Sequence, residues 1–203
     1  MIKKFIDKLL GKTPGGTKQA KKPSFGKREE VGPDVHHINP ELVDRRASDV
    51  VRTLKDAGFE AYIVGGAVRD LLVGLRPKDF DVATNATPEQ VKGLFRRAFI
   101  IGRRFRIVHV VYGRGREHEV IEVSTFRAYL DNAAAEQVAG NEKTSRSELA
   151  GMQHAVDSTG RVLRDNVWGP QDEDAMRRDF TINAMYYDPQ TQVVVDYHKG
   201  IQD

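Results

Sequence analysis

Two aspartates separated by one residue, Asp79 and Asp81, have the types and spacing to bind a hard divalent cation. They belong to a short stretch whose pattern predicts a β-strand, in which successive side chains point to opposite faces. Both carboxylates therefore share one face, while Phe80 and Val82 turn to the other face as apolar anchors. The pattern predicts a rigid site for Mg²⁺, a cation that prefers oxygen ligands.

A pair of glycines, Gly65 and Gly66, stands between a predicted strand and a helix that contains Arg69. Glycine lets the backbone turn sharply, so that a phosphate can approach the amides at the start of the helix. Arg69 adds a full positive charge. Taken singly, the glycine pair is usually an ordinary turn and the aspartate pair a solvated strand edge. Together, in one βαβ-sized unit, they indicate nucleotidyl transfer from a triphosphate.

A third carboxylate is available on a later predicted strand, EHEVIEVSTFRAY, where Val120, Glu122 and Ser124 share a face. If this strand lies beside that of Asp81, Glu122 completes a cluster of three carboxylates. Arg127, at the end of the strand, then faces the nucleotide. By itself, Glu122 would be read as an ordinary exposed residue of a strand.

A basic cluster precedes the hairpin partner of that strand and consists of Arg103, Arg104 and Arg106. Such clusters are most often solvated surface, but close to a triphosphate they can bind phosphates or the RNA backbone. Residues 131–160 are polar and small and lack a sustained period, which predicts a long mobile loop.

Helices are expected on either side of the aspartate strand. One begins with Asn39 as N-cap and Pro40 as first helical residue, continues through ELVDRRASDVVRTLKDAG and stops at Gly58. The other begins after Thr87, with Gln90 completing a capping box. Together with the strands, these helices predict an α+β domain.

Composition allows one ordinary core, since the chain has 203 residues, 39% hydrophobic and 30% charged. There is no cysteine, which excludes disulfides and thiolate metal sites, and no apolar run of membrane-spanning length. The net charge is +3, but residues 1–30 alone carry +6. We therefore expect a basic, disordered extension over residues 1–35, which binds RNA phosphates or serves only solubility, and a cytoplasmic protein.

Four ordered motifs, GGAVRDLL, DFD, IEVSTFR and RRDFTINAM, resemble the head domain of the class II nucleotidyltransferases in the DNA polymerase β superfamily. This family comprises bacterial tRNA CCA-adding enzymes and poly(A) polymerases. The stretches IGRRFRIVHV and RDNVWGPQDEDAMRRDF are similar to the poly(A) polymerase branch. The resemblance implies an α+β fold with a mixed or antiparallel sheet, helices packed against it, and a head domain over residues 36–203.

The resemblance also implies roles for individual residues. Asp79 and Asp81 would bind Mg²⁺, and the third acidic function falls on Glu122 or Asp179. The residues implied to hold the nucleotide's triphosphate and sugar are Gly65, Gly66, Arg69, Arg127, Arg177, Arg178 and Asn183. For Arg177 and Arg178, the alternative is a salt-bridged helix face formed with the acidic run at 172–174.

The activity implied is addition of AMP from ATP to RNA 3′ ends by a two-metal mechanism, with pyrophosphate released. The alternatives are tRNA CCA addition, which also uses CTP, and a non-catalytic nucleotide- or RNA-binding fragment. Enzymes of this family continue into helical neck, body and tail regions, whereas this sequence ends at GIQD. We therefore expect a head domain without its neck, body and tail.

Overall fold

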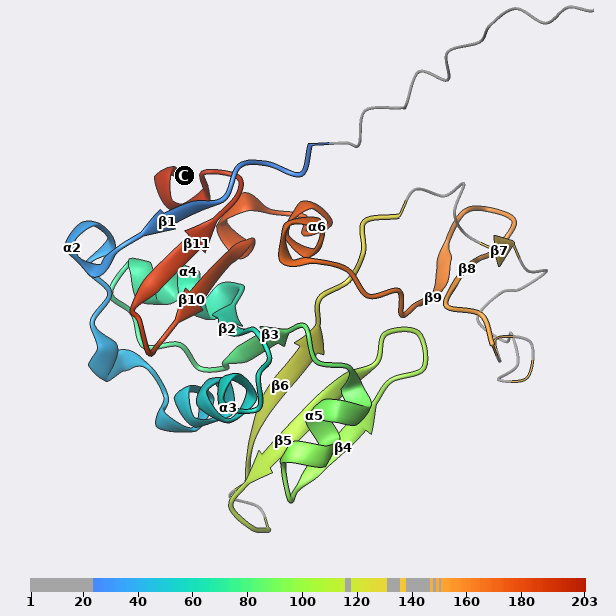
Figure 1. Ribbon diagram of the computed structural model, residues 1–203, viewed down its shortest axis with the longest axis horizontal. Coiled ribbons are helices and arrows are strands. Elements are labelled where there is room, and N and C mark those ends of the chain that lie inside the picture. Colours follow the sequence, from blue (N-terminus) through green and yellow to red (C-terminus); the bar gives the residue numbers. More distant parts are fainter. Residues whose placement is uncertain (1–23, 116–117, 131–135, 138–146, 148, 150) are drawn as a thin grey trace, which may run out of the picture.

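The computed structural model describes residues 24–115, 118–130, 136–137, 147, 149 and 151–203. Eight strands form one mixed sheet in the order β1-β11-β10-β2-β3-β6-β5-β4 (Figure 1). Neighbouring strands are antiparallel except β3 and β6, which are parallel. The strands of this sheet are β1 (Glu29–Val31), β2 (Ala61–Val64), β3 (Asp81–Thr84), β4 (Ala98–Ile101), β5 (Ile107–Tyr112), β6 (Glu119–Thr125), β10 (Met185–Asp188) and β11 (Val193–Asp196). The mixed α+β architecture is the expected one.

A small second sheet and several short helices complete the described chain. The second sheet has the order β7-β8-β9 and consists of β7 (Glu136–Gln137), β8 (His154–Val156) and β9 (Val162–Asp165). The α-helices are α2 (Pro33–His36), α3 (Arg45–Asp56), α4 (Gly66–Leu72), α5 (Pro88–Leu94) and α6 (Gln171–Met176), and the 3₁₀ helices are η1 (Pro40–Leu42), η3 (Thr181–Asn183) and η4 (Gly200–Gln202). Within the described ranges, every helix is too short or too polar to traverse a lipid bilayer.

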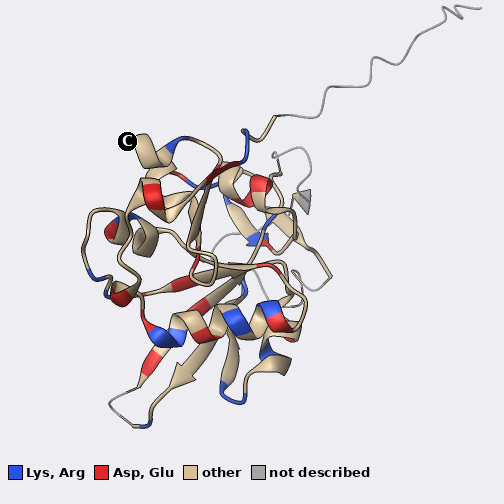
Figure 2. Ribbon diagram, turned by 60° about the vertical axis from the view of Figure 1, so that its left-hand side comes forward, with Lys and Arg blue, Asp and Glu red and all other residues tan. Residues whose placement is uncertain are grey.

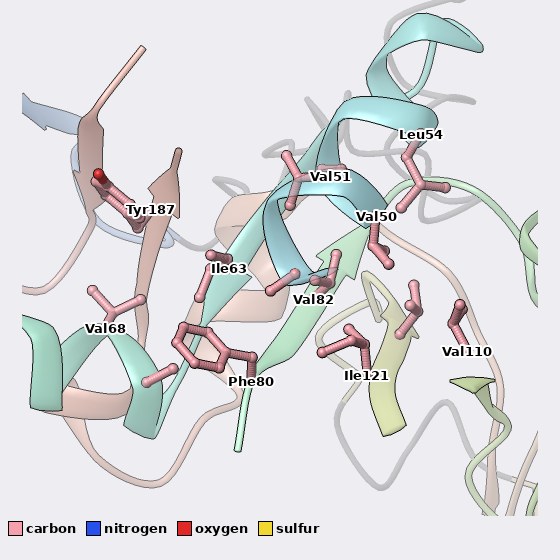
Figure 3. Packing of buried hydrophobic residues seen from close by; sticks show 14 of the residues in the cluster. Val50, Val51, Leu54, Ile63, Val68, Phe80, Val82, Val110, Ile121 and Tyr187 are labelled. Carbon is pink, nitrogen blue, oxygen red and sulfur yellow. The ribbon is translucent and has the colours of Figure 1, made fainter. Parts of the chain in front are cut away.

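The main core lies between one face of the large sheet and helices α3, α4 and α5. Val50, Val51 and Leu54 of α3 are buried beside Val82 of β3 and Ile121 of β6 (Figure 3). A smaller core lies on the opposite face, where α6 packs over β2, β10 and β11, and contains Val64, Ala83, Phe126, Ala175, Tyr186 and Val195. Because the two cores use alternate residues of the same strands, each strand is fixed in register from both sides.

The helix after residue 87 forms as predicted. Thr87 Oγ accepts a hydrogen bond from Gln90 N, and the Gln90 side chain accepts one from Thr87 N, which is a complete capping box. The helix predicted from Pro40 is divided instead. Asn39 caps only the 3₁₀ turn η1, and Asp44 then caps α3, because its carboxylate accepts from Arg46 N at 2.7 Å.

Three strands fall where no regular structure is expected, and one of them is the two-residue β7 inside the predicted loop 131–160. Glu29–Val31 lies inside the predicted disordered extension but pairs with β11 as an edge strand of the large sheet. His154–Val156 lies inside the predicted loop 131–160 but is buried and pairs with β9. The predictions for residues 1–23 and for most of 131–150 lie outside the described residues. Along the described chain, Lys and Arg are interspersed with Asp and Glu (Figure 2).

Candidate active site

The two aspartates lie at the start of β3. The strand begins at Asp81, and Asp79 lies in the bend before it, so the strand is shorter than predicted. The expected alternation nevertheless holds, because Asp79 and Asp81 are exposed while Phe80 and Val82 are buried in the main core. Both carboxylates are thus presented to solvent from a segment that the core holds firmly.

Glu122 joins the aspartates through the one parallel pairing of the large sheet. In the register of β3 and β6, Asp81 lies opposite Glu122, so their side chains are on the same face. Partial desolvation, followed by the negative charge of Glu122, raises the pKa of the Asp81 carboxyl. Asp79 adds to this increase, and Arg178 opposes it. The three carboxylates therefore repel one another, a repulsion that a divalent cation would relieve.

Asp179 has a different position. It is exposed in the bend after Arg178, and it is not among the charged groups that shift the pKa of Asp81. In the strand register it is Glu122 that lies opposite Asp81.

The donor set fits a magnesium ion, although the protein does not form a closed cage for one. Within the described residues, no group of three or more His, Cys, Asp or Glu side chains is arranged to hold a metal ion. Mg²⁺ is usually bound by one or two carboxylates together with water and substrate phosphates. Two exposed aspartates on adjacent positions of one face match that mode of binding.

The double glycine forms the expected turn between β2 and α4. Gly65 has φ +76° and ψ −140°, a conformation that favours glycine. A Cβ on Gly65 would lie 3.9 Å from Nη1 of Arg178, and one on Gly66 would lie 3.3 Å from Nη2 of Arg69. Two guanidinium groups therefore flank this turn, which is the positive surface that phosphate groups need.

Arg69 connects α4 to the segment around η3. Its Nε and Nη2 donate to Asp70 Oδ1 at 3.0 and 2.8 Å, and its Nη1 donates to Asn183 Oδ1 at 3.3 Å. Two predicted nucleotide-binding residues that are 114 positions apart in the sequence are thus in contact.

An open cleft of about 450 Å³ joins the turn to the aspartates. It is lined by Gly66, Ala67, Arg69, Asp70, Leu75, Arg76, Lys78, Asp79 and Asp81. Arg76 and Lys78 were not predicted as site residues. The available signal was their position, because both lie in the short connection RPK that directly precedes DFD.

Asp174 is the common partner of the arginines of the RRDF motif. Its Oδ1 accepts from Arg177 Nε at 3.3 Å, and its Oδ2 accepts from Arg178 Nη2 at 3.1 Å and from Tyr186 Oη at 2.8 Å. Of the ion pairs in the alternative interpretation of Arg177 and Arg178, those to Asp174 are therefore present. They do not remove Arg178 from the site, since this residue also lies beside Gly65 and Asp81.

Arg127 belongs to the same group. Its backbone N–H donates to Asp174 Oδ1 at 3.1 Å, and its buried guanidinium lies over the Phe105 ring, 4.8 Å from the centroid. Burial, and then the charge of Arg177, lower the pKa of the Arg127 guanidinium. Among the described residues, its Nε finds no hydrogen-bond partner.

The cluster Arg103, Arg104 and Arg106 lies apart from the cleft, between β4 and β5. Arg103 and Arg106 line a different cavity, of about 570 Å³, together with Ile100, Gly102, Leu149 and Arg164. Arg106 Nη2 pairs with Glu89 at 2.5 Å, and the Arg104 carbonyl accepts from Asp165 N. These arginines are therefore not grouped with the carboxylates.

Comparison with known proteins gives a consistent result. A family model described as "Poly A polymerase head domain" matches residues 61–203. The chain is 48% identical over 167 residues to poly(A) polymerase I of Haemophilus influenzae, covering 82% of this chain and 33% of that protein. It is 46% identical over 168 residues to poly(A) polymerase I of Salmonella typhi, covering 83% of this chain and 32% of that protein.

CCA-adding enzymes are also similar. That of Lactobacillus helveticus is 37% identical over 158 residues, 78% of this chain and 32% of that enzyme. The solved CCA-adding enzyme of Bacillus stearothermophilus in complex with CTP has 30% identity and a TM-score of 0.52, covering 78% of this chain and 30% of that one. A CCA-adding enzyme in apo form II has a TM-score of 0.58 at 18% identity, covering 86% of this chain and 36% of that one, which shows a shared fold. This chain spans about a third of the length of the relatives that it matches.

Proposed function

Because the chain belongs to the poly(A) polymerase head-domain family, we propose that it contains the active site of a template-independent polynucleotide adenylyltransferase. The reaction transfers AMP from ATP to the 3′-hydroxyl of RNA and releases pyrophosphate, as a step in RNA 3′-end processing. One observation carries the proposal: Asp81 lies opposite Glu122 in the sheet, and Asp79 and Asp81 line one cleft with the turn at Gly66. Phosphoryl transfer needs carboxylates for metal ions and a positive surface for phosphates in one place.

The carboxylates have distinct roles in this proposal. Asp79 and Asp81 hold Mg²⁺, and Glu122 is the third acidic group, with Asp179 as the alternative. When bound, Mg²⁺ supplies activation of the RNA 3′-hydroxyl and neutralisation of the departing pyrophosphate. A bond forms between the 3′-oxygen and the α-phosphorus, the bond from the α-phosphorus to the pyrophosphate oxygen breaks, and the 3′-hydroxyl proton passes to water.

The nucleotide is held on the side of the aspartates that faces the turn of Gly65 and Gly66. In this proposal the triphosphate is bound by the backbone at Gly65 and Gly66 and by the guanidinium groups of Arg69 and Arg178. The positions of these groups around the turn support this role. Asn183 is in reach of the same site through its contact with Arg69. Arg127 and Arg177 complete the group that contacts sugar and phosphates, held next to Arg178 by Asp174.

The remaining assignments follow from this role. Residues 36–203 are the head domain, extended at its edge by β1, and residues before β1 form a basic extension. Arg103, Arg104 and Arg106 contact the RNA backbone away from the carboxylates. A cytoplasmic location suits an enzyme that consumes ATP and RNA ends.

tRNA CCA addition is the second candidate. It is favoured by the likeness to a CCA-adding enzyme solved with CTP. Polyadenylation is preferred because the relatives at 45–48% identity are named poly(A) polymerase I, whereas the CCA-adding relatives reach 32–37%.

Primer extension tests the proposal. Labelled oligo(A) RNA is incubated with Mg²⁺ and each of the four nucleoside triphosphates separately, with a tRNA lacking its CCA end as a second primer. We expect extension of oligo(A) with ATP alone, and its loss on chelation of Mg²⁺. Incorporation of CTP into the tRNA would instead support CCA addition.

Matched variants identify the carboxylates. Asp79→Asn and Asp81→Asn should abolish extension, whereas Asp56→Asn, an exposed carboxylate at the end of α3, should not affect it. Glu122→Gln should reduce the rate far more than Asp179→Asn. Binding of Mg²⁺–ATP without any extension would refute catalysis by this chain and leave a nucleotide-binding fragment.

A further inference from the structure

The row of side chains that contains the carboxylates continues to the edge of the large sheet. In the pairing register, Asp81 of β3 lies opposite Glu122 of β6, Glu122 opposite His109 of β5, and His109 opposite Phe99 of β4. Residues in register share a face, and the 3.3 Å contact between His109 Nε2 and Glu122 Oε1 agrees with this. The carboxylates are therefore continuous with the outer strands.

Over β4, β5 and β6, none of the described helices or strands packs on this face. Helices α3 and α5 pack on the opposite face, where Val108, Val110 and Val123 are buried (Figure 1). On the open side, Phe99 is 52% exposed and Ile101 is 42% exposed. They border a shallow hollow of about 340 Å³ lined by Arg97, Phe99, Ile101, His109, Val111, Gly115, His118 and Val120. Large apolar side chains that are exposed to solvent side by side, next to a polar site, indicate a binding surface.

The position of this surface relative to the phosphate site decides what it can bind. The turn at Gly65 directly follows Val64, which pairs with Asp81, so the triphosphate lies on the β2 side of the aspartates. Glu122 and the open face lie on the other side. In phosphoryl transfer the attacking and leaving oxygens are roughly in line. The RNA 3′-hydroxyl must then approach from the side opposite the leaving pyrophosphate, across β6, β5 and β4.

We propose that the open face of β4, β5 and β6 binds the 3′-terminal nucleotides of the RNA primer, with Phe99 as a stacking platform for a base. This inference rests on the proposed function, because it uses the direction of attack to place the primer. Phe99 lies two strands beyond Glu122, about 10 Å at the usual spacing between strands. A base stacked on Phe99 therefore belongs to the last one or two nucleotides.

The chemistry of the surface suits single-stranded RNA. Among the described residues, the hollow is lined by one arginine and two histidines but no carboxylate, and the charge of the arginine complements that of a phosphate backbone. Aromatic stacking accepts any base, because each base has a π-face. Apolar contacts from Ile101, Val111 and Val120 suit the ribose and base faces. Such a site binds a growing 3′ end without a template and without reading its sequence.

Equilibrium binding of RNA tests the proposal without requiring turnover. The full 203-residue chain is titrated into 5′-fluorescein-labelled oligo(A) at low salt without nucleoside triphosphate, and anisotropy gives the Kd. Phe99→Ala should weaken binding about tenfold, within the range measured for loss of one base–aromatic stack. Phe99→Trp should retain the wild-type affinity, and Phe99→Leu, which keeps apolar area without a π-face, should bind as weakly as Phe99→Ala. Val35→Ala is the control, because Val35 is 64% exposed on α2, remote from this face.

Two further measurements separate this inference from the proposed function. Titration calorimetry with Mg²⁺–ATP should give the same Kd for the wild type and Phe99→Ala, and in extension assays only the KM for primer should rise. RNA with 4-thiouridine at its 3′ end should cross-link to the segment 97–111. The proposal is overturned if wild-type RNA binding is undetectable, if Phe99→Ala binds RNA normally, or if Phe99→Leu restores binding. A change in sedimentation coefficient on Phe99→Ala with unchanged RNA affinity would assign the face to a protein contact instead.

Discussion

Replacement of Asp174 by alanine should lower the free energy of unfolding by about 3 kcal/mol, near the lower end of the range for breaking a buried ion pair. The Asp174 side chain is only 2% exposed and accepts hydrogen bonds from the guanidinium groups of Arg177 and Arg178, from Tyr186 Oη and from the Arg127 backbone. Its removal leaves two positive charges and two polar donors without this partner. The lower end applies because the side chains of Arg177 and Arg178 retain 27% and 20% exposure, so water compensates part of the loss.

Asp174→Asn should cost less, about 2 kcal/mol, because the amide oxygen still accepts a hydrogen bond but the charge is lost. Urea unfolding followed by circular dichroism measures both variants. Asp172→Ala is the matched control, since Asp172 is a carboxylate of the same first turn of α6 with no ion pair to Arg177 or Arg178 among the described contacts. It should cost at most about 0.5–1 kcal/mol, because its carboxylate accepts only from Glu173 N and pairs with neither arginine. A loss below about 1 kcal/mol for Asp174→Ala would refute the view that this carboxylate holds the arginines together.

The same carboxylate gives a pH dependence with a defined sign. Burial alone would raise the pKa of Asp174, but the charges of Arg178 and Arg177 outweigh it and hold the pKa below its ordinary value. A group whose pKa is lower in the folded state stabilises the protein above its unfolded pKa, about 4 for aspartate, and loses that contribution as the pH falls through the folded pKa. Stability should therefore decrease below about pH 4, and Asp174→Asn should show a smaller decrease.

Two further substitutions test the turn and the core beside it. Gly65→Ala should destabilise the protein by about 1–3 kcal/mol in thermal unfolding, because its φ of +76° and ψ of −140° suit glycine alone. Gly93→Ala, inside α5, should instead stabilise the protein by about 0.5–1 kcal/mol, because an added Cβ would meet open space. Equal effects of the two would contradict a strained turn. Tyr186→Phe should lower the free energy of unfolding by about 1 kcal/mol, because the 2.8 Å hydrogen bond to Asp174 is lost. In an Asp174→Ala background the same substitution should have no measurable effect. Additive losses of stability in the double variant would show that the hydroxyl has another role.

Several features of the fold followed from short-range sequence patterns. The capping box of Thr87 and Gln90 formed as predicted, since both partners lie within one helical turn. The turn at Gly65 and Gly66 also formed between strand and helix. The helix expected from Pro40 was wrong in its start, because Asp44 provides a second N-cap whose hydrogen bond to Arg46 N fixes where α3 begins. Competing caps of similar strength cannot be ranked from residue types alone.

The sequence by itself determined the residue types of the candidate site and their local order: two carboxylates separated by one residue, a glycine pair, and the arginines at positions 69, 127, 177 and 178. It left the third carboxylate open between Glu122 and Asp179. Only the tertiary structure decided that β6 lies parallel to β3 with Glu122 opposite Asp81, and that Asp174 binds Arg127, Arg177 and Arg178 together. The reason is physical: hydrogen bonds within a turn depend on neighbouring residues, whereas strand register and buried ion pairs depend on how separate elements share one core.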